Sequence, residues 1–169
     1  MDSLRDLPIE LLERGAVCGR LLTERGATVS VAEGSCGGLI SASLLSVPGA
    51  SGYYVAGTVI YTGQALDAYL GDVVARPEGL RGASEPWARL LATGARIRLG
   101  TTWGVGEGGA AGPTGNRYGD PAGHAWLAVD GPTPAVEQVA TGSDDRAGNM
   151  VAFALAALDL LARQVAATG

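Results

Sequence analysis

The chain has 169 residues, of which 47% are hydrophobic and 17% charged, and its net charge is -5. This composition excludes a disordered chain, and no unbroken apolar run reaches the roughly 18 residues of a membrane span. The acidic balance disfavours nucleic-acid binding. All 12 cationic side chains are Arg, so mechanisms that need a lysine amine are excluded. The length is typical of one domain, spanning residues 1–169.

The beginning of the chain and its few metal-binding side chains bear on location and cofactors. Residues 1–15 are charged and helix-like, which predicts a cytoplasmic protein without an export signal. Cys18 and Cys36 are the two cysteines and His124 is the single histidine. We therefore expect free thiols, no metal site and no cofactor.

The first half of the sequence predicts alternating helices and strands. Apolar residues three or four positions apart indicate helices, and short β-branched segments bounded by glycine indicate strands. In chain order these rules predict a helix over 8–25, a strand at 27–32, a glycine turn at 33–38, a helix at 39–47, a strand at 53–61 and a short helix at 63–70.

The second half continues the pattern around a glycine-rich stretch. Ser84, Glu85 and Pro86 predict the start of a helix that continues through Ile97. The many glycines between 104 and 123 predict a long loop. Two strands at 124–129 and 136–140 and a closing helix at 149–165 follow. This order predicts an α/β fold, a single-domain three-layer α/β/α arrangement with a mixed sheet, without giving the strand order.

The turn at 33–38 is the first candidate site, because it joins a strand to a helix. In that position the amides of Gly37, Gly38 and Leu39 can face an anion or a developing oxyanion. Ser35 or Cys36 is then the candidate nucleophile. A serine needs a base, whereas a thiol at a helix N-terminus is partly ionised by the helix dipole. The alternative is a tight turn that only connects the two elements.

The glycine-rich stretch is the second candidate site. The amides of 108–115 could form a nest for a phosphate, with Arg117 as a bidentate partner, or the stretch could be a flexible surface loop. Arg146 could bind a phosphate or pair with the neighbouring carboxylates. His124 begins an apolar strand, where a structural hydrogen-bonding role is expected.

Several motifs in order resemble the CinA C-terminal domain family, which includes stand-alone nicotinamide-nucleotide amidases. GATVSVAEGSCGG resembles the family pattern G-x-T-x-x-x-A-E-S-C-T-G-G, and ASEPWARLLATGAR resembles V-S-E-x-V…M-A-x-G-A-R. AAGPTGNRYGDPAGHAW keeps the spacing of I-A-G-P-x-G-G…K-P-V-G-T-V-W. The resemblance covers almost the whole chain. It implies a homodimer that hydrolyses the carboxamide of nicotinamide mononucleotide without a metal.

The catalytic positions depart from the family pattern. In an ungapped alignment the catalytic Ser of the family falls on Gly34, and its Cys and Thr fall on Ser35 and Cys36. The catalytic Lys falls on Leu66, and the Thr or Ser before I-A-G-P falls on Gly108. Alternatively, one residue is gained before Ser35 and one is lost after Cys36, which keeps the Ser-Cys pair. Neither alignment identifies a base.

Two functions are favoured by this pattern, and a purely structural subunit is a third possibility. The first is a divergent, metal-independent hydrolase that acts on a pyridine-nucleotide-like or modified amide. The second is a catalytically inactive nucleotide-binding or partner-binding module that keeps the pocket. The candidate catalytic residues are Ser35, Cys36 and Tyr61, and the candidate substrate-binding residues are Glu33, Gly37, Gly38, Gly112, Gly115, Arg117 and Arg146.

Overall fold

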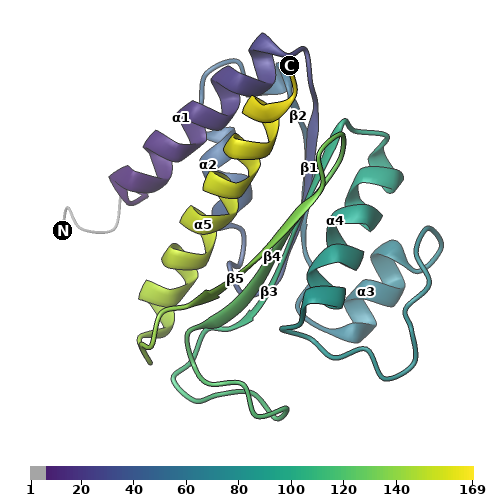
Figure 1. Ribbon diagram of the computed structural model, residues 1–169, viewed down its shortest axis with the longest axis vertical. Coiled ribbons are helices and arrows are strands. Elements are labelled where there is room, and N and C mark those ends of the chain that lie inside the picture. The colour runs from purple at the N-terminus through teal and green to yellow at the C-terminus, as the bar shows by residue number, and fades with distance from the viewer. Residues whose placement is uncertain (1–6) are drawn as a thin grey trace.

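Five strands form one mixed sheet that lies between two layers of helices in the computed structural model, which describes residues 7–169 (Figure 1). The first six residues of the charged N-terminal segment therefore lie outside the described part. The elements, in chain order, are α1 (Ile9–Glu24), β1 (Val29–Glu33), α2 (Leu39–Leu45), the 3-10 turn η1 (Ala50–Gly52), β2 (Tyr54–Val59), α3 (Gly63–Leu70), α4 (Glu85–Leu99), β3 (Trp103–Ala110), β4 (His124–Asp130), β5 (Ala135–Ala140) and α5 (Arg146–Ala167).

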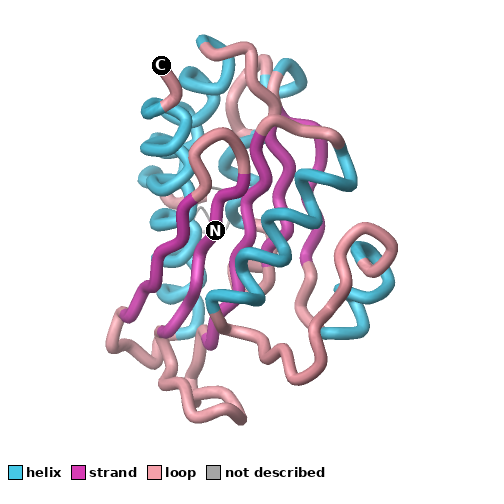
Figure 2. Tube along the Cα trace, turned by 45° about the vertical axis from the view of Figure 1, so that its right-hand side comes forward, coloured by secondary structure: helices cyan, strands magenta, loops and turns pink. Residues whose placement is uncertain are grey.

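The strand order of the sheet is β2-β1-β3-β4-β5. β1 is parallel to both β2 and β3, whereas β3, β4 and β5 pair antiparallel. Helices α1, α2 and α5 cover one face, and α3 and α4 cover the other (Figures 1 and 2). The predicted three-layer α/β/α fold with a mixed sheet is confirmed. Ligands of such sheets bind at the carboxyl ends of the parallel strands, which here are β1, β2 and β3.

The predicted loop at 104–123 is wrong in its first half, because β3 is a central strand. Its glycines let α4 lie directly on the strand. A Cβ atom at Gly104 would be 2.0 Å from the carbonyl oxygen of Ala92, and one at Gly106 would be 2.1 Å from that of Ala88. Glycine in a strand marks such a close backbone approach. Here it reflects tight packing and not flexibility.

The substitution Gly106→Ala is expected to lower the free energy of unfolding by roughly 1–3 kcal/mol, because the new methyl group overpacks the contact between β3 and α4. Chemical denaturation measures this loss. Gly52→Ala is the matched control, since no atom lies within 4 Å of its Cβ position. Equal losses in the two variants would contradict the close packing of α4 on β3.

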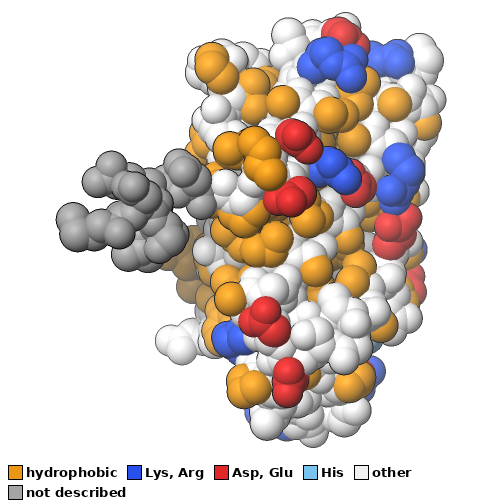
Figure 3. Space-filling view, turned by 90° about the vertical axis from the view of Figure 1, so that its left-hand side faces the viewer, with side chains coloured by type: hydrophobic (Ala, Val, Ile, Leu, Met, Phe, Trp, Pro, Cys, Tyr) orange, Lys and Arg blue, Asp and Glu red, His pale blue; other side chains and the backbone are white. Residues whose placement is uncertain are grey.

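Helix α5 is a core helix, although it is long and apolar enough to cross a membrane by length and composition, with a hydropathy of 1.6. Phe153, Leu158 and Leu161 on this helix are fully buried in the main core cluster. Its neighbours are α1, α2 and the sheet. On the outer side of this helical layer, apolar side chains are interspersed with Arg, Asp and Glu (Figure 3). This is the pattern of a helix that packs within a folded domain.

Candidate functional site

A pocket of about 670 Å³ opens at the edge of the sheet where the carboxyl ends of β1, β2 and β3 meet. Its walls come from the segments that follow these strands, the start of α4 and two loops. Of the residues proposed from the sequence, Ser35, Tyr61 and Arg117 line it. The structure therefore joins part of the first candidate site to part of the second.

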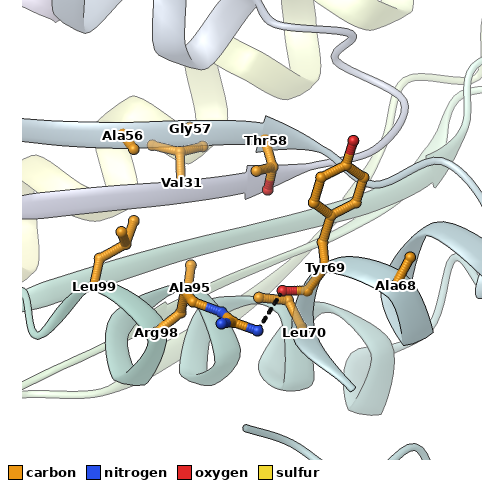
Figure 4. A pocket seen from close by; sticks show the side chains of 10 residues that line it. All are labelled: Val31, Ala56, Gly57, Thr58, Ala68, Tyr69, Leu70, Ala95, Arg98 and Leu99. Atoms are coloured by element: carbon orange, nitrogen blue, oxygen red, sulfur yellow. Dashed lines mark hydrogen bonds between the residues drawn. The ribbon is translucent and has the colours of Figure 1, made fainter. Parts of the chain in front are cut away.

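A second pocket, of about 330 Å³, lies between β2, α3 and α4 (Figure 4). Its walls are mostly apolar, and the Arg98 guanidinium donates a hydrogen bond to the Tyr69 carbonyl oxygen at 3.0 Å. No Ser, Cys, His, Asp or Glu is among the described residues that line this pocket. A third pocket, of about 230 Å³, has His124, Ser143 and Asp144 in its lining. Of the candidate nucleophiles proposed from the sequence, Ser35 lies in the larger pocket.

The turn after β1 is held by Glu107, a fully buried residue of β3. The Ser35 hydroxyl donates a hydrogen bond to Oε1 of Glu107. Oε2 accepts hydrogen bonds from the amides of Gly34 at 3.0 Å and Cys36 at 2.9 Å. One carboxylate thus orients the turn and contacts the hydroxyl that lines the pocket.

Glu107 is a suitable base for Ser35. Burial raises the pKa of the Glu107 carboxyl, an effect that the Ser35 hydrogen bond partly opposes. A carboxylate with a raised pKa is a stronger proton acceptor than an exposed one. Sequence reasoning missed this residue, and the signal was a lone acidic residue in the otherwise uncharged segment WGVGEGGA.

The structure disfavours Cys36 as the nucleophile. Its side chain is fully buried in the main core cluster and does not line the pocket. Burial raises the pKa of the Cys36 thiol well above its ordinary value, and the nearby charges of Glu107 and Glu33 raise it further. The thiolate is the reactive form of cysteine. Of the two candidate nucleophiles, only Ser35 reaches the pocket.

Glu33 caps helix α2 and is not among the residues that line the pocket, so its role in substrate binding stays a prediction. Oε2 accepts from the Ile40 amide at 3.0 Å, and Oε1 accepts from the Ser41 amide at 3.0 Å and its hydroxyl at 2.7 Å. Gly37 and Gly38, with φ of 63° and 105°, shape the turn and also lie outside the pocket wall. Only glycine adopts such φ values readily.

Gly112 and Gly115 also lie outside the pocket wall, so the phosphate nest at these positions stays a prediction. The Gly112 carbonyl oxygen accepts a hydrogen bond from Nη1 of Arg146 at 2.5 Å, and Nη2 of Arg146 donates to the Tyr61 hydroxyl at 3.2 Å. A Cβ atom at Gly115 would be 2.2 Å from the carbonyl oxygen of Asp120. Arg146 thus ties the loop to the end of β2 and does not line the pocket.

Three arginines lie at or near the opening of the pocket, although the chain is acidic. Arg117 lies 5.0 Å from the centre of the Tyr118 ring and donates to the Tyr118 hydroxyl at 2.8 Å. Arg81 lies 5.7 Å from the same ring centre. Arg76 also lines the pocket and pairs with Asp67 at 2.8 Å. Arg81 pairs with Asp120 at 3.8 Å, whereas no ion pair is found for Arg117 within residues 7–169. Arg117 is therefore the cation that can attract an anionic group to the opening.

The matched family and the relatives of the chain identify its fold. A family model described as the CinA C-terminal domain matches residues 13–165. The chain belongs to the CinA C-terminal domain family. A CinA-like protein of Anaeromyxobacter dehalogenans (strain 2CP-C) is 41% identical over 142 residues, which cover 83% of this chain and 34% of the relative. One from Parasynechococcus marenigrum is 38% identical and covers 98% of this chain and 38% of the relative. The chain thus spans about a third of these relatives' length.

Solved structures agree with this family. The competence/damage inducible protein CihA of Agrobacterium tumefaciens has a TM-score of 0.86 at 27% identity, over 96% of this chain and 99% of that chain. A CinA superfamily protein of Klebsiella pneumoniae has a TM-score of 0.85 at 23% identity, over 92% of this chain and 98% of that chain. The second likeness concerns the fold alone. The names of these proteins state no substrate or reaction.

The two positions at which the resemblance implies a catalytic Ser and Lys carry other residues in the ungapped alignment. Leu66, at the position of the family Lys, is buried beside Ile60 and Leu70 and does not line the pocket. Gly34, at the position of the family Ser in the ungapped alignment, lines the pocket through its backbone alone. A Cβ atom at Gly34 would lie 3.2 Å from the carbonyl oxygens of Glu107 and Ile60. In the ungapped alignment, chemistry in this pocket uses other side chains, whereas in the alternative alignment Ser35 takes the position of the family Ser.

Proposed function

We propose that this CinA C-terminal domain is a metal-independent hydrolase in which Ser35 is the nucleophile and Glu107 is the base. One observation carries the proposal: the Ser35 hydroxyl lines the pocket and donates its hydrogen bond to a buried carboxylate. In the reaction, Ser35 Oγ attacks the substrate carbonyl carbon while its proton passes to Glu107. Glu107 then protonates the leaving nitrogen, and water hydrolyses the acyl-serine.

The substrate in this proposal is a small pyridine-nucleotide-like or modified amide. The pocket volume of about 670 Å³ is typical of sites for small molecules. Arg76 and Arg117 would attract a phosphate, and the aromatic side chains of Tyr61 and Tyr118 offer surface to a planar ring. The tight turn keeps the Ser35 hydroxyl directed at its base.

Two of the three turn amides that the sequence suggests as oxyanion donors are engaged within the turn. The Gly37 amide donates to the Gly34 carbonyl oxygen at 3.1 Å, and the Leu39 amide donates to that of Cys36 at 3.3 Å. Both donors are therefore occupied by the turn itself. In the proposed hydrolase, the charge on the substrate oxygen is stabilised by donors elsewhere in the pocket.

Product analysis tests the proposal directly. The protein is incubated with nicotinamide mononucleotide and with related pyridine amides, and ammonia and the acid product are quantified in the presence and absence of a chelator. We expect equimolar ammonia and acid, with rates that the chelator does not change. Acid quenching during turnover should yield an acylated peptide that contains Ser35, and hydroxylamine should release its acyl group as a hydroxamate. Turnover of an amide without any acyl-Ser35 would contradict this mechanism.

A second candidate function is binding without turnover. It is favoured because the Glu107 carboxylate already accepts three hydrogen bonds, from the Gly34 and Cys36 amides and the Ser35 hydroxyl. In that case calorimetry would detect binding of nicotinamide mononucleotide or its acid, and prolonged incubation would give no product. Product formation at any rate above the uncatalysed reaction would exclude this alternative.

A further inference from the structure

Trp87, in the first turn of α4, has a hydrogen-bond donor that no protein group uses. Its side chain lines the large pocket and is 6% exposed. No partner is found for its Nε1 within residues 7–169, yet no fully buried side-chain nitrogen or oxygen in this part of the chain lacks a partner. The indole N–H is therefore reached from the pocket. A buried indole usually has a partner for its N–H, so an open donor here suits a ligand.

The indole takes the space of a side chain at position 108. A Cβ atom at Gly108 would lie 2.5 Å from Cδ1 of Trp87 and 2.8 Å from its Nε1. The CinA pattern has Val at position 87 and Thr or Ser at position 108. In this chain the Trp87 indole on α4 fills the space of the Thr or Ser side chain on β3 and supplies a hydrogen-bond donor in its place. The differences from the pattern at positions 87 and 108 therefore compensate each other.

A second free donor lies beside the same position. The Ala83 nitrogen is 3.6 Å from the Gly108 Cβ position, and its N–H has no partner among the described residues. Ala83 has a φ of 53°, a strained conformation for a residue other than glycine. Its carbonyl oxygen accepts from Nε2 of His124 at 3.1 Å, and Nδ1 of His124 accepts from Nε2 of Gln138 at 3.1 Å. His124 therefore holds this segment in place.

We infer that the Trp87 indole N–H and the Ala83 N–H form a subsite for a carbonyl or carboxylate oxygen carried by a planar ring. An indole nitrogen only donates, as does a backbone nitrogen, so both groups select an acceptor. The indole beside them supplies flat apolar surface. Trp87 is thus a specificity-determining residue of the pocket. The inference rests on the proposed function for the choice of pocket, but it requires no turnover.

Binding to the Ser35→Ala protein tests the subsite without interference from hydrolysis. The probes are nicotinic acid mononucleotide and the matching pyridinium mononucleotide that lacks the carboxylate. Adding Trp87→Phe should weaken binding of the first probe by roughly tenfold, because one hydrogen bond to a charged group is lost. Binding of the second probe should change less than twofold. The difference in Kd between the probes, measured by calorimetry, is the readout.

A double variant separates loss of the indole donor from loss of the folded structure. Trp87→Val combined with Gly108→Thr restores the side chains of the family pattern, including a hydroxyl donor. We expect this protein to fold and to keep its preference for the carboxylate probe. An unchanged Kd in Trp87→Phe, equal weakening of both probes, or no binding of either probe by the parent would overturn the inference.

The hydrolase and the subsite can fail separately. Absence of turnover in the unsubstituted protein, together with selective weakening in Trp87→Phe, would contradict the hydrolase and support the subsite. Normal turnover in Trp87→Phe with an unchanged KM would support the hydrolase and contradict the subsite.

Discussion

Replacing Glu107 with Gln is expected to lower kcat by roughly 10²–10⁴-fold, the usual contribution of a general base. The amide has the shape of the carboxylate and can still accept from the Gly34 and Cys36 amides, so the turn should persist. It cannot take the Ser35 proton. Initial rates of ammonia release measure the effect.

Ser35→Ala should cause a loss of the same order, and combining the two changes should add little, because a nucleophile and its base act as a unit. Cys36→Ala is the control, since the Cys36 thiol lies outside the pocket wall, and it should leave kcat unchanged. A protein that keeps its activity with Gln at position 107 would show that Ser35 uses another base.

The pH profile offers a second check on Glu107. Burial raises the pKa of this carboxyl above its ordinary value of 4.5, so the basic form is lost at a higher pH than for an exposed glutamate. We expect kcat to fall as the pH drops through the raised pKa, and the residual rate of Glu107→Gln to lack this acidic limb. An identical limb in both proteins would assign it to another group.

The raised pKa of Glu107 is expected to lower the stability of the folded protein as the pH rises, whereas it lowers kcat as the pH falls. Because the folded-state pKa of Glu107 exceeds the unfolded-state value, the contribution of this group is present below the unfolded-state pKa. It is lost as the pH rises through the folded-state pKa. Denaturation curves over this window should therefore show a decline in stability that Glu107→Gln reduces.

Replacing Glu33 with Leu is expected to lower the free energy of unfolding by roughly 3 kcal/mol or more. The change leaves the amides of Ile40 and Ser41 and the Ser41 hydroxyl without their acceptor. Each buried donor left unpaired costs about 1–3 kcal/mol. Urea denaturation followed by circular dichroism measures the loss.

Two related variants separate the cap from the burial of a large side chain. Glu33→Gln keeps an acceptor oxygen and the volume, so its loss should be clearly smaller than that of Leu. Ser41→Ala removes a single donor and should cost about 1 kcal/mol. If Glu33→Leu were no more destabilising than Ser41→Ala, the capping role of Glu33 would be wrong.

Most of the fold could be predicted from local patterns. The apolar spacing over 8–25 and the Ser84 cap identified α1 and α4, because amphipathic helices carry their periodicity in the sequence. β3 was missed because its glycines have no side chains to alternate. Its glycines make sense only once α4 is known to lie against them, and that contact is tertiary.

Only the part of the site that is formed by consecutive residues could be predicted from the sequence. Ser35 was found because a strand, a turn and a helix follow one another directly. Glu107 reaches it because β1 and β3 pair with Glu33 opposite Glu107, across more than seventy residues of chain. Trp87 and Gly108 likewise meet only in three dimensions. No local motif joins these residues.

The two glutamates that face each other across β1 and β3 hold the two ends of one short segment. Glu107 binds the side next to the strand, and Glu33 binds the side next to the helix. The backbone around Ser35 is therefore already ordered before any ligand arrives. Binding then requires little loss of conformational entropy and little reorganisation of dipoles. A site of this kind is preorganised for its ligand, and the turn does not need to close over the ligand when it binds.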